Sequence, residues 1–248
     1  MKIIEQRIQT TYVIIVNQLL LAWCLFNIFQ WWMLPLIILN LYLFGIFWEV
    51  AIHRYWSHQS FKTSRPKEIV LLLWAFLTGQ GSILGWCNVH RHHHKYEDTK
   101  KDPHSPFYEN WFRIYLGYFK NRCDEIFVRD LLRHNDRKYL TFENKYYYLM
   151  WSAMWIITYI ISPLLFFWLV SGSATWWIAT TAINIVAHGK LLGKQQFSDS
   201  VATNSSILNV LTGMGNHNNH HKYPASYTCS TGKEIDIHGW VIKYCFKK

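Results

Sequence analysis

Two long stretches of this chain contain neither lysine nor arginine, and they constrain its fold more than any other feature. They are residues 11–52 and 146–188, and all 25 Lys and Arg residues lie outside them. Both stretches are mostly apolar, and each is about twice the ~20 residues that a helix needs to cross a bilayer. We therefore expect an integral membrane protein in which each stretch forms a helical hairpin.

The apolar runs divide into four predicted transmembrane helices, at about residues 11–29, 33–52, 147–169 and 174–188. A Trp pair and Pro35 mark the first predicted turn, and residues 171–173, Ser-Gly-Ser, mark the second. A signal peptide is disfavoured for the first run, because a second apolar run follows at once without a small-residue cleavage site. The predicted fold class is all-α integral membrane, with residues 1–248 as one domain.

The basic residues indicate which side of the membrane the polar segments occupy. Residues 53–146 and 189–248 carry all but the first two of them. By the positive-inside rule, these segments form a cytosolic helical cap, and both termini are cytosolic. Within the cap, the apolar run Ile69–Leu77 is too short to span and is predicted as a helix in the cap or at the membrane face. Residues 234–244 are predicted as a short amphipathic helix.

Charge and cysteine usage narrow the function classes. The formal net charge of +10 belongs to the cap, where it faces lipid headgroups and anionic partners. No nucleic-acid-binding motif accompanies it. The five Cys residues are scattered without a CxxC pair, which indicates reduced thiols rather than disulfides or a Cys-ligated zinc. Any metal chemistry must therefore use other ligands.

Histidines supply those ligands in three clusters, all of them in the predicted cap. Two clusters share one spacing: His90, His93 and His94, and later His217, His220 and His221. On a helix the positions i, i+3 and i+4 project from one face, so each cluster forms part of a cage for a transition metal. His92 points away from its neighbours and is expected to be no ligand. The isolated His134 and His238 are expected to be solvated or hydrogen-bonded.

The first cluster and its neighbours need a different geometry. His53 and His58 are five residues apart, about 140° around a regular helix, so we expect the helix to end or unwind between them. His188 ends the fourth predicted span, one turn after Asn184. Glu49 is the only acidic residue in a predicted span and lies one turn before His53. It either hydrogen-bonds that imidazole or reaches towards the cytosol.

The number of histidines predicts the number of metal ions. The three clusters and His188 together supply nine imidazoles. One transition-metal ion rarely takes more than about six ligands, so nine imidazoles predict two ions with positions left open for chemistry. Iron, zinc and copper all accept imidazole, so the donor set leaves the metal open.

These motifs resemble the membrane fatty acyl desaturases of the stearoyl type. The resemblance is carried by His53-Arg-Tyr-Trp-Ser-His58, by His90-Arg-His-His-His94 with Asp102-Pro-His104 behind it, and by His217-Asn-Asn-His220-His221. It covers nearly the whole chain from about residue 45. It implies that a di-iron centre is ligated by His53, His58, His90, His93, His94, His188, His217, His220 and His221, with Asn184 holding one iron through a water. It also implies a structural role for His104.

The resemblance implies an oxidoreductase that uses dioxygen and two electrons to place a cis double bond, most often at Δ9, in a saturated acyl chain. Breaking an unactivated C–H bond requires a metal–oxygen oxidant, which also favours iron. The substrate is expected to be an acyl-CoA or acyl-lipid. Because the sequence contains no b-type cytochrome domain, a separate donor, ferredoxin or a b-type cytochrome, is expected. The family usually has Glu at the position of Met214 and an aromatic or apolar residue at that of Asn216. Its segment before the first histidine box is usually small and Gly-rich, unlike residues 47–50 here. None removes a ligand, but they leave substrate and donor contacts open.

Three alternatives remain open at this point. A related di-iron hydroxylase acting on a lipid or carotenoid would differ only in the fate of the substrate radical, so product analysis separates it. A metal transporter should place polar ligands at mid-membrane, where the predicted spans have almost none. A zinc hydrolase usually mixes carboxylates with histidines around the metal.

Overall fold

The computed structural model describes residues 6–118, 123, 126–133 and 137–248. The regular elements of this part of the chain are all helices, and isolated β-bridges join Asn204 to Lys194 and to Asn216. The long helices are α1 (Gln6–Asn27), α2 (Leu34–Phe47), α7 (Lys138–Ile161) and α8 (Pro163–His188). The helix α2 continues without a break into the π-helix η2 (Trp48–Ser57). The predicted all-helical architecture is confirmed.

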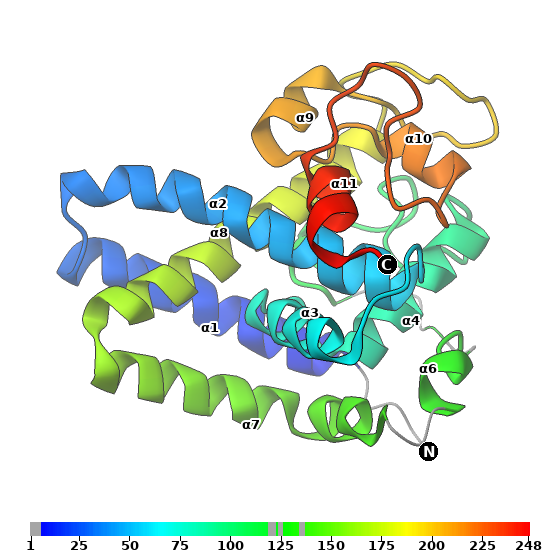
Figure 1. Cartoon of the computed structure of the whole chain (residues 1–248). Helices are drawn as coiled ribbons and strands as arrows, with labels where there is room; N and C mark the ends of the chain where they lie inside the picture. Colours follow the sequence, from blue (N-terminus) through cyan, green and yellow to red (C-terminus); the bar gives the residue numbers. More distant parts are fainter. Residues whose placement is uncertain (1–5, 119–122, 124–125, 134–136) are drawn as a thin grey trace.

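The long helices form two hairpins that lie side by side, and a layer of shorter elements covers one end of them (Figure 1). Helix α8 packs against α1, α2 and α7. Buried polar contacts join the hairpins as well: Asn40 of α2 donates to the carbonyl of Trp168 (3.1 Å) and to Ser171 Oγ (2.9 Å) of α8. Helix α8 is therefore the element around which the others are arranged.

Three stretches of the described residues are long and apolar enough to cross a membrane. They are Thr10–Asn27, Trp31–Ser57 and Pro163–His188. Helix α7 is as long as the others but is not among them, because its first turns carry Glu143 and Lys145 and several Tyr residues follow. The predicted count of four spans therefore remains a prediction.

The turn of the second hairpin lies ten residues before its predicted position. The chain turns at Ser162, whose hydroxyl accepts from Leu165 N, and Pro163 starts α8. Both features favour the start of a helix. The Ser-Gly-Ser segment at 171–173 lies inside α8 instead. There the hydroxyl of Ser173 donates to the carbonyl of Leu169 (3.0 Å), and Gly172 lies against Phe44 of α2. The predicted spans 147–169 and 174–188 are thus wrong in their boundaries.

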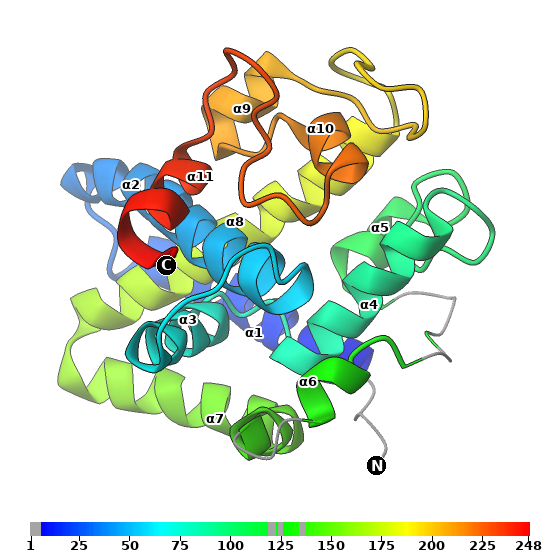
Figure 2. The ribbon, with the colours of Figure 1, turned by 45° about the vertical axis from the view of Figure 1, so that its right-hand side comes forward.

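The shorter elements are the 3₁₀ turn η1 (Trp31–Met33), α3 (Arg65–Leu77), α4 (Ile83–Tyr96), α5 (Trp111–Tyr115), α6 (Arg129–Arg133), α9 (Ser206–Thr212), α10 (His217–Lys222), α11 (Ile237–Val241) and the π-helix η4 (Ile242–Phe246). Helix α3 confirms the helix expected over Ile69–Leu77. The helix expected over 234–244 begins at Ile237, because Asp236 caps it by accepting from Gly239 N. Figure 2 shows α9, α10 and α11 above α4. The turn η1 joins α1 to α2 at the other end of the first hairpin.

Helix α7 holds the start of α4, which carries the second histidine cluster. The Glu143 carboxylate accepts from Ile83 N (3.1 Å), and Asn144 donates to Ser82 Oγ (2.6 Å). Ser82 Oγ in turn accepts from Gly85 N (3.2 Å). The first backbone N–H groups of a helix have no partner inside the helix, so these contacts satisfy donors that would otherwise be buried and unpaired.

Close packing of α8 on α2 generates a first prediction. A Cβ atom at Gly172 would lie 2.2 Å from Cε2 of the buried Phe44. We expect Gly172→Val to force the two helices apart and to destabilise the protein by about 1–3 kcal/mol, the usual cost of overpacking. Thermal unfolding of the detergent-purified protein measures this. The matched control is Gly232→Ala, whose Cβ would meet only Glu234 Oε2 at 3.5 Å. Equal melting temperatures for the two variants would contradict the prediction.

Candidate metal centre

The π-helix η2 brings His53 and His58, which are five residues apart, to the same side. Its backbone hydrogen bonds run from residue i+5 to residue i, and His58 N donates to the carbonyl of His53 (3.1 Å). In such a helix, residues five apart lie above one another on one face. The expected unwinding between His53 and His58 is therefore wrong: the helix widens, and both rings point to the same side.

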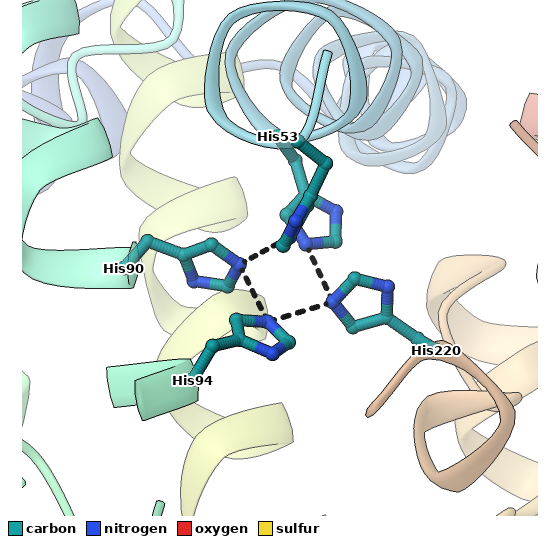
Figure 3. A group of neighbouring side chains, drawn as sticks. His53, His90, His94 and His220 are labelled. Carbon is teal, nitrogen blue, oxygen red and sulfur yellow. Dashed lines mark hydrogen bonds between the residues drawn. The ribbon is translucent and has the colours of Figure 1, made fainter. Parts of the chain in front are cut away.

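Five imidazoles converge on one point between η2, α4 and α10. They belong to His53, His58, His90, His94 and His220. The Nε2 atoms of His53 and His220 are 3.0 Å apart, and those of His220 and His94 are also 3.0 Å apart. His90 Nε2 lies 3.1 Å from His94 Nε2. Figure 3 shows these rings pointing inward from the separate elements. We call these residues the five-histidine group.

Four further imidazoles converge on a neighbouring point, at the end of α8. They are His93 of α4, His188 of α8, and His217 and His221 of α10. The Nε2 atom of His217 lies 2.9 Å from that of His188 and 3.2 Å from that of His221. The ring of His93 is 4.8 Å from that of His188, centroid to centroid. We call these residues the four-histidine group. All nine predicted ligands therefore lie in one of two adjacent groups.

Helices α4 and α10 each contribute to both groups. On α4, His90 and His94 belong to the five-histidine group, whereas His93 belongs to the four-histidine group. Since each cluster projects from one face of its helix, small differences in direction decide which group a ring joins. Asn184 is half-buried, one turn before the end of α8, and lines the same cavity as His217.

Carboxylates contact the outer nitrogens of several of these rings. Glu49 Oε2 lies 2.7 Å from His53 Nδ1, so Glu49 hydrogen-bonds this imidazole, which was the first of the two interpretations of Glu49. The remaining carboxylates follow α4 in the chain. Asp102 Oδ2 lies 2.8 Å from Nδ1 of His93, and Asp98 Oδ2 lies 2.8 Å from Nδ1 of His188. Glu97 Oε2 lies 3.0 Å from Nδ1 of His221, a close contact without the geometry of a hydrogen bond.

These contacts show that the two groups suit metal ions. A carboxylate at Nδ1 places the ring proton there and leaves the Nε2 lone pair facing inward. Inward lone pairs about 3 Å apart repel unless a proton or a metal ion lies between them. Two nitrogens that bind one ion at right angles, each about 2.1 Å away, are about 3.0 Å apart. The Nε2 separations of 2.8–3.2 Å match this value, so the donor set fits two imidazole-ligated ions.

Burial keeps these imidazoles neutral, as metal binding requires. It lowers the pKa of seven of them well below the usual 6.5, and the neighbouring imidazoles lower it further: His58, His90, His93, His94, His217, His220 and His221. A protonated ring would be a charge without water around it and beside other rings. Neutral imidazoles can bind a metal ion without first losing a proton.

Of the remaining histidines, the three that the structure describes lie outside the two groups. His92 packs against Phe127, with ring centroids 5.4 Å apart. His104 stacks on His93 at 4.3 Å, and its backbone N donates to Asp102 (3.0 Å), which fits a structural role. His238 is buried against Gly213. His134 lies outside the described residues.

A cavity of about 60 Å³ borders both groups. His53 and His90 line it from one group and His217 from the other, while Trp86 and Trp177 form apolar wall. The volume leaves room for a few water molecules or for part of a ligand. A substrate atom in this cavity would therefore face the points where the Nε2 atoms converge.

The fold and the site define a class: an all-helical protein with candidate membrane spans and buried histidine groups that could hold metal ions. The comparison with known families narrows this class. The model of the fatty acid desaturase family matches residues 29–230, so the chain belongs to that family.

Known members of the family are similar over most of this chain. A (11Z)-hexadec-11-enoyl-CoA conjugase of Bombyx mori is 29% identical over 232 residues, covering 80% of this chain and 66% of its own. An acyl-CoA Delta(11) desaturase of Choristoneura rosaceana is 28% identical, covering 84% and 68%. The Delta(9)-fatty-acid desaturase fat-7 of Caenorhabditis elegans is 28% identical, covering 80% and 63%. The chain thus spans about two thirds of the length of these relatives.

Sequence reasoning missed most of the carboxylates that orient the rings. Glu97 and Asp98 directly follow the second cluster, and a search for acidic residues near each cluster would have found them. Their partners His188 and His221 are far away in sequence, so spacing alone could not have paired them.

Loss of one imidazole from the five-histidine group should release one metal ion. His94 Nε2 lies within 3.1 Å of two other Nε2 atoms, whereas His92 points to the other side of α4. We expect about two metal ions per chain in the wild type, about one in His94→Ala and about two in His92→Ala. Metal analysis of the purified proteins checks this. Loss of metal in His92→Ala alone would refute the assignment.

Acid should weaken both the fold and metal binding. Because the folded-state pKa of the buried imidazoles is lowered, the unfolded chain binds more protons below its ordinary pKa of about 6.5. The contribution of neutral imidazoles to stability is therefore complete above pH ~6.5 and declines as the pH falls below it. We expect metal content after dialysis to be constant between pH 7 and 8 and to fall steeply between pH 6 and 5. A flat profile down to pH 5 would contradict this.

Proposed function

We propose that this protein is a membrane fatty acyl desaturase that uses dioxygen to introduce a cis double bond into a saturated acyl chain. The observation that carries the proposal is the convergence of nine imidazole Nε2 atoms on two adjacent points beside a cavity. Membership of the fatty acid desaturase family gives that arrangement its reaction class.

We propose that the two histidine groups bind two iron ions. The five-histidine group would hold one ion. The four-histidine group would hold the other, with Asn184 bound to it through a water. Bound iron supplies the redox chemistry with dioxygen that no amino-acid side chain can provide. Imidazole suits zinc and copper as well, so the choice of iron depends on the family and on the reaction.

The chain itself would hold the substrate and exclude water. Trp48 stacks on His53 with ring centroids 5.0 Å apart, and Trp86 stacks on His90 at 4.5 Å. These indoles fix the two rings and present apolar surface to the cavity. A chain held there would offer a fixed pair of neighbouring methylene groups to the centre, and this positioning is how an enzyme selects one bond among many equivalent ones.

The substrate and the position of the double bond are part of the proposal. Relatives named as an acyl-CoA Delta(11) desaturase and as a (11Z)-hexadec-11-enoyl-CoA conjugase support an acyl-CoA substrate, with an acyl-lipid as the alternative. A third relative is named as a Delta(9)-fatty-acid desaturase. We propose Δ9 first, and Δ11 is the alternative that these relatives raise. The electrons would come from a separate acidic donor, ferredoxin or a b-type cytochrome, that binds the basic face of the cap.

The membrane arrangement follows from the same proposal. All 248 residues would form one domain, in which α1, α2 with η2, α7 and α8 cross the bilayer. Both termini and both histidine groups would face the cytosol. The absence of Lys and Arg from residues 11–52 and 146–188 supports this orientation.

The test is fatty-acid profiling of a desaturase-deficient host that expresses the chain, beside His93→Ala as a matched control. We expect a monounsaturated acid with the intact chain only, and about two irons per purified chain. The control loses an Nε2 of the four-histidine group and should produce none. A hydroxylated acid would show a related hydroxylase instead, and a protein that binds zinc and leaves the lipids unchanged when a donor is supplied would refute the proposal.

A further inference from the structure

We propose that two separate parts of the chain support the two metal sites, so that each ion can be lost without the other. The segment 227–239 supports the five-histidine group through the positioning residue Glu49. The acidic loop 97–102 supports the four-histidine group. This inference rests on the proposed two-metal function, and its test does not depend on desaturation.

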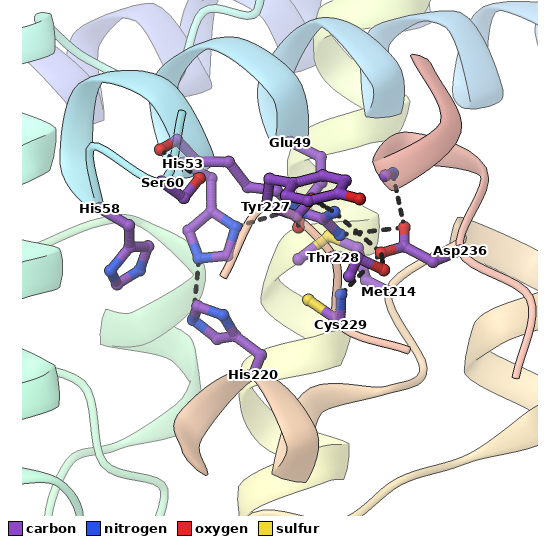
Figure 4. Close-up of polar contacts among 12 residues, drawn as sticks. Glu49, His53, His58, Ser60, Met214, His220, Tyr227, Thr228, Cys229 and Asp236 are labelled. Atoms are coloured by element: carbon purple, nitrogen blue, oxygen red, sulfur yellow. Dashed lines mark hydrogen bonds and ion pairs between the residues drawn. The ribbon is translucent and has the colours of Figure 1, made fainter. Parts of the chain in front are cut away.

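Glu49 connects the ring of His53 to a buried series of ion pairs, which we call the ion-pair chain. One carboxylate oxygen, Oε2, contacts His53 Nδ1 at 2.7 Å, and the other, Oε1, accepts from Arg54 Nε at 2.7 Å. The guanidinium then donates to Asp236, from Nη1 to Oδ2 at 2.9 Å and from Nη2 to Oδ1 at 3.1 Å. Figure 4 shows Glu49 and Asp236 on opposite sides of this chain of contacts. His53 is thus linked to a residue 183 positions later.

The segment 227–239 holds the far end of this chain in place. Arg54 Nη1 also donates to the carbonyl of Tyr227 (2.7 Å). Asp236 accepts from the backbone N of Cys229 (2.7 Å) and of Gly239 (2.9 Å), and from the Thr228 hydroxyl (2.9 Å). A carboxylate with this many donors has little freedom to move. The position of Arg54, and through it that of Glu49, is therefore set by a segment that supplies no metal ligand.

Burial makes the three charged side chains of this ion-pair series depend on one another. The side chains of Glu49, Arg54 and Asp236 are each about 2% exposed. Removing Arg54 would leave the buried carboxylates of Glu49 and Asp236 without their shared cation, which is strongly unfavourable. Removing either carboxylate would leave Arg54 with one charged partner instead of two.

The four-histidine group has a different support. Its three carboxylate contacts come from Glu97, Asp98 and Asp102, which lie within six residues directly after α4. This loop is itself fixed, because Asp98 N donates to Asp102 Oδ2 (2.8 Å), the Ser105 hydroxyl donates to Asp98 Oδ1 (2.6 Å) and the Ser200 hydroxyl donates to Glu97 Oε1 (2.6 Å). These contacts of the loop are separate from the contacts that Glu49, Arg54 and Asp236 make with one another.

The two groups therefore differ in their dependence on carboxylates. Among the described residues, carboxylates contact three of the four rings in one group, and only His53 of the five in the other. A carboxylate at Nδ1 fixes the orientation of an imidazole and makes it a stronger ligand. Loss of Glu49 removes all such support from the five-histidine group, whereas loss of one loop carboxylate leaves two in the other group.

The experiment compares variants of the two supports in the full-length protein, loaded with ⁵⁷Fe(II) alone. Mössbauer spectra resolve the two iron environments, and a colorimetric chelator measures the release of each iron. We expect Glu49→Ala to weaken the binding of one iron about 10–100-fold and to leave the spectrum of the other unchanged. Asp98→Ala should affect the other iron, to a smaller extent. Asp236→Asn, which touches no ligand, should loosen the same iron as Glu49→Ala.

A conservative variant separates positioning from simple misfolding. Glu49→Gln retains an acceptor for either His53 or Arg54 but not for both, so it should hold two irons with faster release and an altered spectrum at one site. Loss of both irons together in Glu49→Gln and in Asp98→Ala would overturn the inference, as would unchanged release in Asp236→Asn. Wild-type protein without two irons would refute the two-metal function as well. Two irons without an unsaturated product would refute only the desaturase activity, and the variants would still decide the inference.

Discussion

The structure depends on the close approach of nine imidazole rings whose inward lone pairs would repel one another without a proton or a metal ion between them. The Nε2 separations are 2.8–3.2 Å. Because burial disfavours charged rings, the imidazoles remain neutral, and neutral imidazoles can bind metal ions between these nitrogens. The fixed ends of α4, α8 and α10 and the widened turn of η2 all serve to hold these rings against that repulsion, and the carboxylates behind them hold their orientation.

The centre lies where apolar helices meet polar loops, and this position suits chemistry on a lipid. His188 is the last residue of α8, and His53 lies in the π-helix that ends the α2 segment. Both helices begin in strongly apolar sequence, so the same elements that cross a membrane carry ligands at one end. An acyl chain could therefore reach the centre without leaving an apolar environment, while the headgroup and the electron donor remain at the basic face. The position of the helix ends thus connects the proposed membrane arrangement to the proposed reaction.

Several features could be predicted from residues that are close in sequence. The spacing of His90, His93 and His94 predicts one helical face, and α4 confirms it. The π-helix at His53 was not predictable, because its residues would also suit an α-helix and only the need to bring both rings to one site favours the wider turn. The turn at Ser162 was missed in favour of residues 171–173, since Ser and Gly indicate turns in general. Inside α8 these small residues instead allow the close approach of Phe44.

The sequence by itself predicted the nine imidazoles that the structure gathers in two groups, because imidazoles at helical spacing can be counted and assigned to faces without knowledge of the fold. It also determined that the chain alternates apolar helices with a basic, polar cap. The tertiary structure alone decided which ring joins which group, since His93 and His94 are adjacent in sequence yet serve different points. It alone paired His53 through Glu49 and Arg54 with Asp236. Such pairings depend on distances between segments that are far apart along the chain, and local periodicity carries no information about those distances.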